Sequence, residues 1–456
     1  MSDLNPKLTR RHFLKGAAAA TGVLVASAPG VSFAQKASTI NFLRQRAQVE
    51  PITILINDSP WFPGFEVLVN NYVDATGNDV NLNVTPFAGM LEKSRNAVLG
   101  DESEFDILNL NEQWYMPFYA GGLVKPITEI KPDFELDPNI IEYDSATRWD
   151  PNVRYSTPDG AIYGLPINGN IQLYFYRRDL FEEEGVAVPN TWDEVETVAQ
   201  MFHNPPEMHG WTIRSKPPNF PYQAFLESYG TSVIRLDLET GAWSVGLAGP
   251  EAIEATNMFL HLGRTYGPAN YADMGQAENM ALMASGRLAQ AHMVCAVAPN
   301  FDNEDQSVVV GKMGAGVVPG GPVSRATMSG IWVMGIPHNL PEARQVAALT
   351  FLEWALSKDA QLDYTLAGGI PVRQDVYEEL ASDEKIGWWM KAMADSTPYI
   401  KAQPRLAETP QIIEVIDRRI GQAIVDELSI EEALQEASKE IQAILEAGEY
   451  NVTPLE

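Results

Sequence analysis

Residues 52–56, Ile52-Thr53-Ile54-Leu55-Ile56, begin the pattern that decides the fold. This short apolar run is rich in β-branched residues, which predicts a buried strand. Apolar side chains then recur at helical spacing at Phe65, Leu68, Val69 and Tyr72. Gly77 follows this stretch and is predicted to end the helix, because glycine favours the left-handed conformation that closes many helices.

The alternation of strand and helix continues to residue 110. Residues 80–84 alternate apolar with polar side chains, which predicts a second strand. Residues 90–99 predict a second helix closed by Gly100, and residues 105–110 predict a third strand. This order of strands and helices predicts a parallel sheet with right-handed crossovers.

A second α/β region follows in the middle of the chain. Strands are predicted within residues 162–176, with an interruption at 168–170, and again over residues 289–297. Residues 192–202 predict a helix with Thr191 as its cap. The C-terminal part is predicted to be helical over 341–356, along the stripe Ile413, Ile416, Ile420 and Ile424, and after the capping box Ser429-Ile430-Glu431-Glu432.

Three loops at the ends of the first predicted strands carry candidate binding residues. Ligands of open α/β sheets bind outside the carboxyl ends of the strands, which here are followed by residues 57–64, 85–87 and 111–115. The candidates are Asp58 and Trp61 in the first loop and Glu112, Gln113 and Trp114 in the third. Neither GxGxxG nor GxxxxGK[ST] occurs, so no nucleotide phosphate cradle is predicted.

The N-terminal residues predict export. Thr9-Arg10-Arg11-His12-Phe13-Leu14-Lys15 precedes an apolar run from Gly16 to Ala28, which is the layout of a twin-arginine signal. The run is shorter than the ~20 residues of a bilayer span. Ser32-Phe33-Ala34 suits cleavage before Gln35, so residues 1–34 are expected to be removed after export by the twin-arginine translocase. We therefore expect a periplasmic protein that folds before it is exported.

Composition excludes several classes of site and partner. The 456-residue chain has a net charge of −28, and without residues 1–34 it keeps 28 basic and 59 acidic residues, a net charge of −31. Such a surface repels nucleic acid and anionic lipid. Cys295 is the single cysteine, so no internal disulfide forms and no cysteine follows the signal to carry a lipid anchor. With six histidines and no HExxH or CxxC motif, neither a metal site nor a cofactor is predicted.

A series of motifs spread over the mature chain resembles one known family. The motifs are Tyr163–Asn170, Leu173–Phe181, Pro189–Glu194, Leu282–Ala289, Gly330–Pro337 and Gly368–Arg373. In this order and spacing they resemble the family 1 extracellular solute-binding proteins of ABC importers, a sugar-binding group that includes maltose-binding-like proteins. The resemblance implies a periplasmic binding protein fold with two lobes, each a mostly parallel sheet flanked by helices, joined by a multi-strand hinge.

The resemblance also implies the boundaries of the lobes and a binding function without catalysis. The N-terminal lobe is expected to comprise residues 35–168 plus 330–378, and the C-terminal lobe residues 169–329 plus 379–456. The lobes are expected to close over a ligand by a hinge motion. The implied protein is a monomeric receptor, not an enzyme, and it delivers its solute to the membrane permease of an ABC transporter.

The residue types near the expected cleft favour a neutral sugar or polyol. Aromatic rings fit the C–H face of a sugar, and amide or carboxylate side chains fit its hydroxyls. We expect Trp332 and either Trp61 or Trp114 to sandwich a sugar ring. The full set of expected contacts is Asp58, Trp61, Glu112, Gln113, Trp114, Asn168, Asn170, Trp211, Trp332 and Arg373, with Arg214 and residues 293–299 as further candidates.

Two other classes of function stay open at this point. A carboxylate solute needs a forked arginine, for which Arg95, Arg214 and Arg373 are candidates, and a polyamine needs acidic side chains beside aromatic rings. A glycoside hydrolase needs two carboxylates across the cleft, and Asp58 with Glu112 is the candidate pair.

Overall fold

The predicted strand-helix alternation is present at the start of the structure, a computed structural model that describes residues 49–455. The predicted twin-arginine signal and its cleavage point lie outside the described residues. The first elements are β1 (Ile52–Asn57), α2 (Phe62–Thr76), β2 (Val80–Thr85), α3 (Phe87–Leu99) and β3 (Ile107–Asn111). Gly77 closes α2 with a φ of 77°, a left-handed conformation that glycine adopts without steric cost. The sequence prediction for this region is confirmed.

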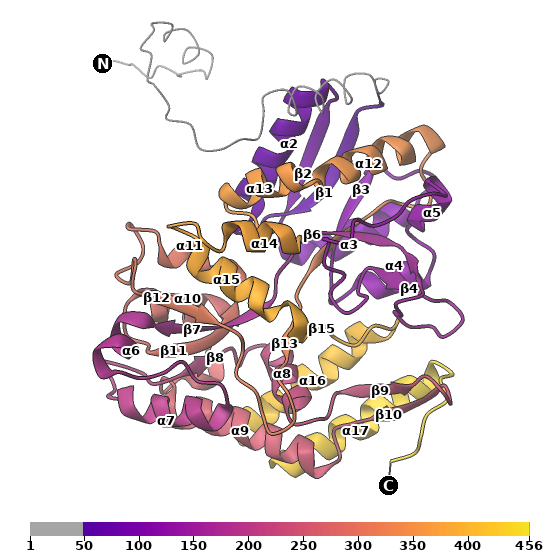
Figure 1. Cartoon of the computed structure of the whole chain (residues 1–456). Coiled ribbons are helices and arrows are strands. Elements are labelled where there is room, and N and C mark those ends of the chain that lie inside the picture. The colour runs from indigo at the N-terminus through magenta and orange to yellow at the C-terminus, as the bar shows by residue number, and fades with distance from the viewer. Residues whose placement is uncertain (1–48, 456) are drawn as a thin grey trace, which may run out of the picture. The chain divides into compact units, whose positions relative to one another are not determined.

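These strands belong to a five-stranded sheet with the order β2-β1-β3-β14-β6. The two added strands are β14 (Trp332–Gly335) and β6 (Gly164–Asn168). β1 is parallel to β2 and β3, whereas β14 is antiparallel to both of its neighbours. Helices α2, α12 (Glu342–Ala355) and α13 (Lys358–Leu366) pack together on this sheet (Figure 1). We call these elements the first lobe.

A four-stranded sheet with the order β12-β7-β11-β8 organises the second lobe. Its strands are β7 (Gln172–Arg177), β8 (Thr212–Ile213), β11 (Gln290–Val294) and β12 (Met313–Gly316). β11 and β12 are antiparallel to β7, and β8 is parallel to β11. The predicted strand at 289–297 is shorter than expected, because residues 295–297 turn into a 3-10 helix.

Each sheet contains one strand that runs against the others, β14 in the first and β7 in the second. Both strands begin where the chain has just crossed from the other lobe, at residues 329–331 and 169–171. The other strands end at this junction, since Trp332 pairs with Asn111 and Asn168, and Gln172 pairs with Val294. A strand that starts at the junction must therefore run in the opposite direction. The expectation of mostly parallel sheets holds for the remaining strands of each sheet.

Five helices of the second lobe form a layer that packs against its sheet and extends beyond it. α7 (Trp192–Phe202), α8 (Asn219–Ser228), α9 (Pro250–Tyr266), α16 (Thr409–Ile424) and α17 (Ile430–Ala447) form a layer at the lower side of Figure 1. α15 (Gly387–Ser396) contacts β12 and β7. The remaining elements are α4 (Tyr115–Ala120), α5 (Ile127–Ile130), β4 (Arg148–Trp149), β5 (Ala161–Ile162), α6 (Arg178–Glu184), β9 (Ile234–Asp237), β10 (Ala242–Val245), η1 (Tyr271–Asp273), α10 (Gln276–Ala284), η2 (Cys295–Val297), α11 (Ala298–Phe301), β13 (Thr327–Met328), α14 (Gln374–Leu380), η3 (Thr397–Tyr399) and β15 (Ile400–Lys401).

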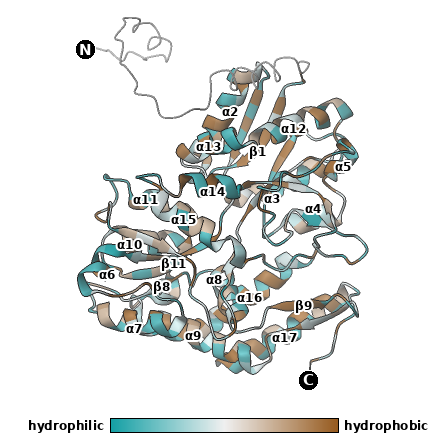
Figure 2. Ribbon diagram, viewed as in Figure 1, coloured by the Kyte–Doolittle hydropathy of each residue, from teal (hydrophilic) through white to brown (hydrophobic). Residues whose placement is uncertain are grey.

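Buried apolar side chains form two clusters among the described residues. The larger cluster includes the strands of the five-stranded sheet and continues through the junction into β7 and β11. The other cluster joins the helical layer of the second lobe and contains Trp192 and Trp211. Apolar residues accordingly concentrate on the strands and the inward faces of helices (Figure 2). Within residues 49–455, no helix combines the length and apolarity that a membrane crossing requires.

The C-terminal helix pair follows its sequence pattern closely. Ile413, Ile416, Ile420 and Ile424 are buried along α16. The predicted capping box at the start of α17 is present, because Ser429 Oγ accepts the Glu432 N–H at 3.2 Å and the Glu432 carboxylate accepts the Ser429 N–H at 3.0 Å. Two N–H groups that would otherwise lack a helical partner are therefore satisfied.

Replacing Ser429 by alanine should lower the free energy of unfolding by about 1 kcal/mol, because one N–H of the first turn of α17 loses its acceptor. Urea unfolding monitored by circular dichroism measures this difference. Gln435→Ala is the matched control, since Gln435 is exposed on the same helix and its removal should change stability by less than ~0.5 kcal/mol. Equal stability of the two variants would contradict the role of the cap.

Candidate functional site

A cavity of about 280 Å³ lies where the strand ends of the two lobes face each other. The first lobe contributes residues that follow its strands: Ser59, Pro60 and Trp61 after β1, Phe87 after β2, and Asn111 and Gln113 at the end of β3. The second lobe contributes Arg214 after β8, Val294 and Ala296 at the end of β11, and Phe220 and Gln276 from two helices. Asn170, Gly330, Trp332 and Gln403 complete the lining at the junction. The cavity thus occupies the position expected for a ligand of open α/β sheets.

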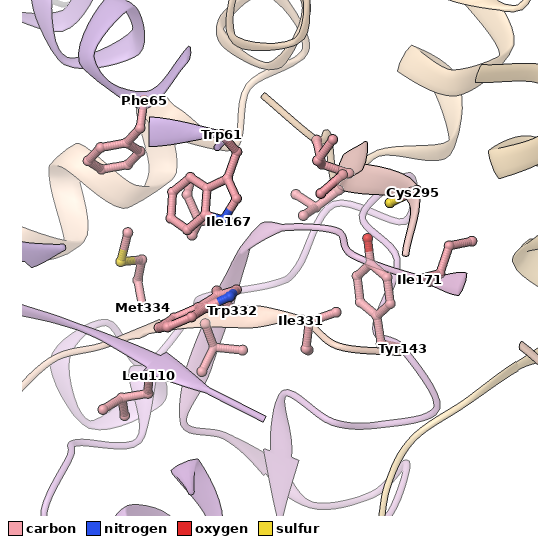
Figure 3. Packing of buried hydrophobic residues seen from close by; sticks show 14 of the residues in the cluster. Trp61, Phe65, Leu110, Tyr143, Ile167, Ile171, Cys295, Ile331, Trp332 and Met334 are labelled. Atoms are coloured by element: carbon pink, nitrogen blue, oxygen red, sulfur yellow. The ribbon is translucent and has the colours of Figure 1, made fainter. Parts of the chain in front are cut away.

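An aromatic cluster centred on Trp332 forms one wall of the cavity. The Trp332 ring centroid lies 6.1 Å from that of Trp61, 6.0 Å from that of Trp114 and 5.9 Å from that of Phe87. Figure 3 shows the Trp61 and Trp332 rings next to each other beside the apolar core of the first lobe. Phe87 remains 47% exposed, whereas the tryptophans are almost fully buried by their neighbours.

This arrangement does not contain the sandwich expected from the sequence. Ring centroids about 6 Å apart belong to aromatic side chains in direct contact, and the Trp61 and Trp332 planes are tilted by 59°. No sugar ring fits between them. The cluster instead offers a single apolar surface formed by Trp61, Phe87 and Trp332.

Amide side chains supply most of the polar lining. These residues are Asn111, Gln113, Asn170, Gln276 and Gln403. The Gln403 side-chain oxygen is buried and has no hydrogen-bond partner within the described residues. The amides bring both donors and acceptors into the cavity, and no aspartate or glutamate is among the lining residues. Arg214 is the charged residue of the lining.

Comparison with known proteins identifies the family. A sequence profile of the bacterial extracellular solute-binding proteins matches residues 68–392 of this chain. The chain belongs to this family. The match covers both lobes and the junction between them, and it places the protein outside the cytoplasm.

Relatives and solved structures agree with this assignment. This chain is 24% identical over 261 residues to the mannitol-binding protein of Pseudomonas aeruginosa, a match that spans 56% of this chain and 57% of that protein. It is 21% identical over 402 residues to the erythritol/L-threitol-binding protein of Mycolicibacterium smegmatis, with 82% and 83% covered.

The fold is shared with the crystal structure of an ABC transporter solute-binding protein of Agrobacterium radiobacter K84 in complex with ribitol. The two structures superpose with a TM-score of 0.72 at 20% identity, over 87% of this chain and 99% of the other. This similarity confirms the expected two-lobe periplasmic binding protein fold.

Several residues expected in the site of this solute-binding protein line the cavity or support it. Trp61, Gln113, Asn170 and Trp332 belong to the lining. Trp114 lies behind it, where its ring contacts Phe87 at 4.9 Å. The fully buried Asn168 on β6 donates a long hydrogen bond of 3.5 Å to the Tyr364 hydroxyl and is not among the lining residues. Asp58 is exposed outside the lining.

Trp211 and Arg373 do not line the cavity, and the structure gives each a different role. Trp211 is fully buried in the helical cluster of the second lobe, with its ring stacked on that of Tyr174 at 6.4 Å. Arg373 is buried and forms ion pairs of 2.9 Å with Asp137 and Asp375, so its donors are already satisfied. We leave both residues out of the proposed site.

Glu112 holds the junction together and does not line the cavity. It is 2% exposed. Its carboxylate accepts hydrogen bonds from Ser329 Oγ at 2.7 and 2.9 Å, from Ile331 N at 3.1 Å and from Gln403 N at 3.0 Å. Burial raises the pKa of this carboxyl to about 7, although these donors oppose the shift.

Eight lining residues were not expected as contacts from the sequence: Ser59, Pro60, Phe87, Asn111, Phe220, Gln276, Gly330 and Gln403. Asn111 is the last residue of β3 and Phe87 lies two residues after the end of β2, so the strand-end rule pointed to their loops without selecting them. Gln276 begins helix α10, and Gln403 lies in an irregular segment after β15. Neither segment has a periodic sequence pattern that would have identified it as part of a binding site. Within residues 49–455, no group of three His, Cys, Asp or Glu side chains is arranged to hold a metal ion.

The raised pKa of Glu112 predicts a pH dependence of stability. The folded-state pKa of about 7 lies above the ordinary glutamate value of ~4.3. The stabilisation from protonated Glu112 is therefore fully present below about pH 4 and is lost as the pH rises through 7. We expect the free energy of unfolding of the wild type, relative to Glu112→Gln, to fall between pH 5 and pH 8.

Urea unfolding of both proteins at the two pH values measures this change. The other titrating groups cancel in the difference, because the glutamine variant differs from the wild type only in a group that cannot ionise. A constant difference between the two proteins would show that burial does not govern the ionisation of Glu112.

Proposed function

We propose that this protein is the receptor of an ABC importer and binds a sugar or polyol in the cavity between its lobes. The observation that carries the proposal is the lining itself, in which amide side chains and an aromatic wall occur without a carboxylate. Hydroxyl groups both donate and accept hydrogen bonds, and amides match them in both roles. The aromatic wall suits the C–H groups between the hydroxyls.

The size of the cavity favours a single small solute. Its volume of about 280 Å³ lies at the lower end of the ~300–1,000 Å³ typical of small-molecule pockets. A single aromatic wall, in place of a sandwich, serves an open-chain polyol as well as one face of a sugar ring. The relatives are named for mannitol, erythritol and L-threitol, and the similar structure contains ribitol. We therefore propose a solute of about monosaccharide size.

Lobe closure explains how the solute is captured and released. We propose a first lobe of residues 35–168 plus 330–378 and a second of residues 169–329 plus 379–456. Arg214, Phe220 and Gln276 lie on the second lobe, whereas Trp61 and Gln113 lie on the first. A ligand that contacts both groups stabilises the closed state by its differential affinity. The closed form then docks on the membrane permease.

The rival classes of function receive less support from the lining. A polyamine would need carboxylates around its ammonium groups, and a glycoside hydrolase would need an acidic pair across the cavity. The lining contains neither. Asp58 lies outside the cavity, and Glu112 uses both oxygens within the junction. We propose a binding protein without catalytic activity, cofactor or metal.

The route of export completes the proposal. The arginine pair at Arg10-Arg11 supports export by the twin-arginine translocase, with release into the periplasm after cleavage before Gln35. The acidic surface supports a soluble protein that acts as a monomer, without a nucleic-acid partner.

A thermal-shift screen of the purified protein tests the proposed ligand class. A solute that binds only the folded state stabilises it by ~2.7 kcal/mol at a concentration of 100 Kd. We expect erythritol, ribitol, mannitol or a simple hexose to raise the melting temperature, and putrescine to have no effect. Stabilisation by amines alone would contradict the proposal, and so would the recovery of cleaved product from an incubated glycoside.

Substitutions in the lining should weaken the binding of the solute identified by this screen. Trp332→Ala should lower the affinity at least tenfold, because it removes the centre of the aromatic wall. Gln113→Ala should lower it by about threefold to tenfold, the value of one neutral hydrogen bond. Isothermal titration calorimetry measures both changes.

Gln411→Ala is the matched control for Gln113→Ala, since Gln411 is exposed at the start of α16 away from the cavity. Circular dichroism establishes that each variant is folded. Unchanged affinity in folded Trp332→Ala would remove the aromatic wall from the binding site.

A further inference from the structure

Arg214 is a guanidinium in the ligand cavity without a polar partner. Its side chain lines the cavity, and it forms no hydrogen bond or ion pair with any residue of the described chain. Its Nε atom is buried. The Phe220 ring, which also lines the cavity, lies 5.4 Å from the Arg214 Cζ atom. A half-buried arginine with five free N–H donors is costly to keep unless something accepts from it.

Three other enclosed arginines of the described chain, Arg177, Arg373 and Arg405, each have a carboxylate partner. Arg177 contacts Asp179 at 2.6 Å, and Arg373 contacts Asp375 at 2.9 Å. Arg405 contacts Asp144 at 3.1 Å. These three arginines are as deeply buried as Arg214 or more so. Arg214 therefore departs from the way in which this fold satisfies its enclosed cations.

The charged side chain nearest to Arg214 accepts no hydrogen bond from it. Asp417 acts on it only at longer range, and the carboxylate of Asp417 is already occupied by the Asn219 N–H at 2.9 Å and the Asn219 side-chain amide at 2.7 and 2.8 Å. Burial lowers the pKa of Arg214 to about 10 while Asp417 opposes the shift, so the group is cationic at neutral pH. His292 also interacts electrostatically with Arg214, and both of its buried ring nitrogens lack a hydrogen-bond partner.

We propose that the solute carries a carboxylate group that binds Arg214, so that the preferred ligand is a sugar acid. This inference rests on the proposed function, since the same amides and aromatic wall bind the hydroxyl-bearing carbon chain of such an acid. The guanidinium fork presents two parallel N–H groups that match the two oxygens of a carboxylate. A phosphate carries nearly two negative charges at neutral pH, whereas the lining contains one cation.

Matched pairs of ligands test the proposal in the purified protein. Ribitol and D-ribonate, and likewise D-mannitol and D-mannonate, differ only in whether the terminal carbon is an alcohol or a carboxylate. Isothermal titration calorimetry should give an affinity about tenfold to a hundredfold higher for the acid of the better-fitting pair, the value of a charge-assisted hydrogen bond. An alcohol that binds as tightly as its acid would overturn the inference and leave the proposed function standing.

Variants at Arg214 separate its charge from its shape. Arg214→Gln should remove the preference for the acid, and Arg214→Lys should retain only part of it, because lysine keeps the charge without the fork. Arg178→Gln is the matched control, since Arg178 is exposed in the second lobe and donates to the Gly311 carbonyl outside the cavity. The control should keep the full preference.

The outcomes distinguish the two proposals. If folded Arg214→Gln keeps the wild-type preference for the acid, Arg214 is not the carboxylate site. If neither the acids, the alcohols nor simple sugars bind the wild type, the proposed function fails together with the inference. Circular dichroism and melting temperature establish the folding of each variant, and Arg214→Lys serves if the glutamine variant does not fold.

Discussion

The buried carboxylate of Glu112 is the interaction on which the arrangement of the two lobes depends. It lies at the end of β3 and accepts hydrogen bonds from two separate segments of the junction, residues 329–331 and Gln403. These segments are themselves joined, because the Ser329 N–H donates to the Lys401 carbonyl at 2.8 Å. One side chain of the first lobe thereby fixes the chain at two crossing segments. Three cavity residues belong to these segments: Gly330 and Trp332 flank the donor Ile331, and Gln403 is itself a donor to Glu112.

The junction also explains the chemistry of the cavity. Because β14 and β7 begin where the other strands end, the loops of both sheets converge on one small volume. The strand ends of the first lobe contribute mostly polar and aromatic side chains, and the acidic residues of this strongly anionic protein are absent from the lining. Of the two carboxylates in these loops, Asp58 is exposed outside the lining, and Glu112 accepts hydrogen bonds from the Ser329 hydroxyl and from two backbone N–H groups. The polar lining of the cavity therefore consists mainly of neutral amides, with Arg214 as its one charged side chain.

The sequence predicted the elements more completely than the site. Residues 52–111 follow a regular alternation, and the capping box at Ser429 depends on neighbours within one helical turn, so local rules were sufficient for both. Local rules could not tell that Trp332 lines the cavity and Trp211 does not. Tryptophan is equally suited to a buried core and to a ligand site, so the residue type does not distinguish the two positions. Their difference arises from which helices pack above them. Gln403 comes close to β3 through contacts between residues far apart in the chain.

The single thiol of the chain has a consequence of a different kind. Cys295 is fully buried next to the junction, where the Tyr143 hydroxyl points toward it (Figure 3), and burial raises the pKa of the thiol to about 12. Thiolate is the form that reacts with disulfides and alkylating reagents, so the Cys295 thiol reacts slowly while the protein is folded. The rate at which Cys295 is labelled therefore reports how often this region opens. The single thiol is thus a built-in probe of local unfolding.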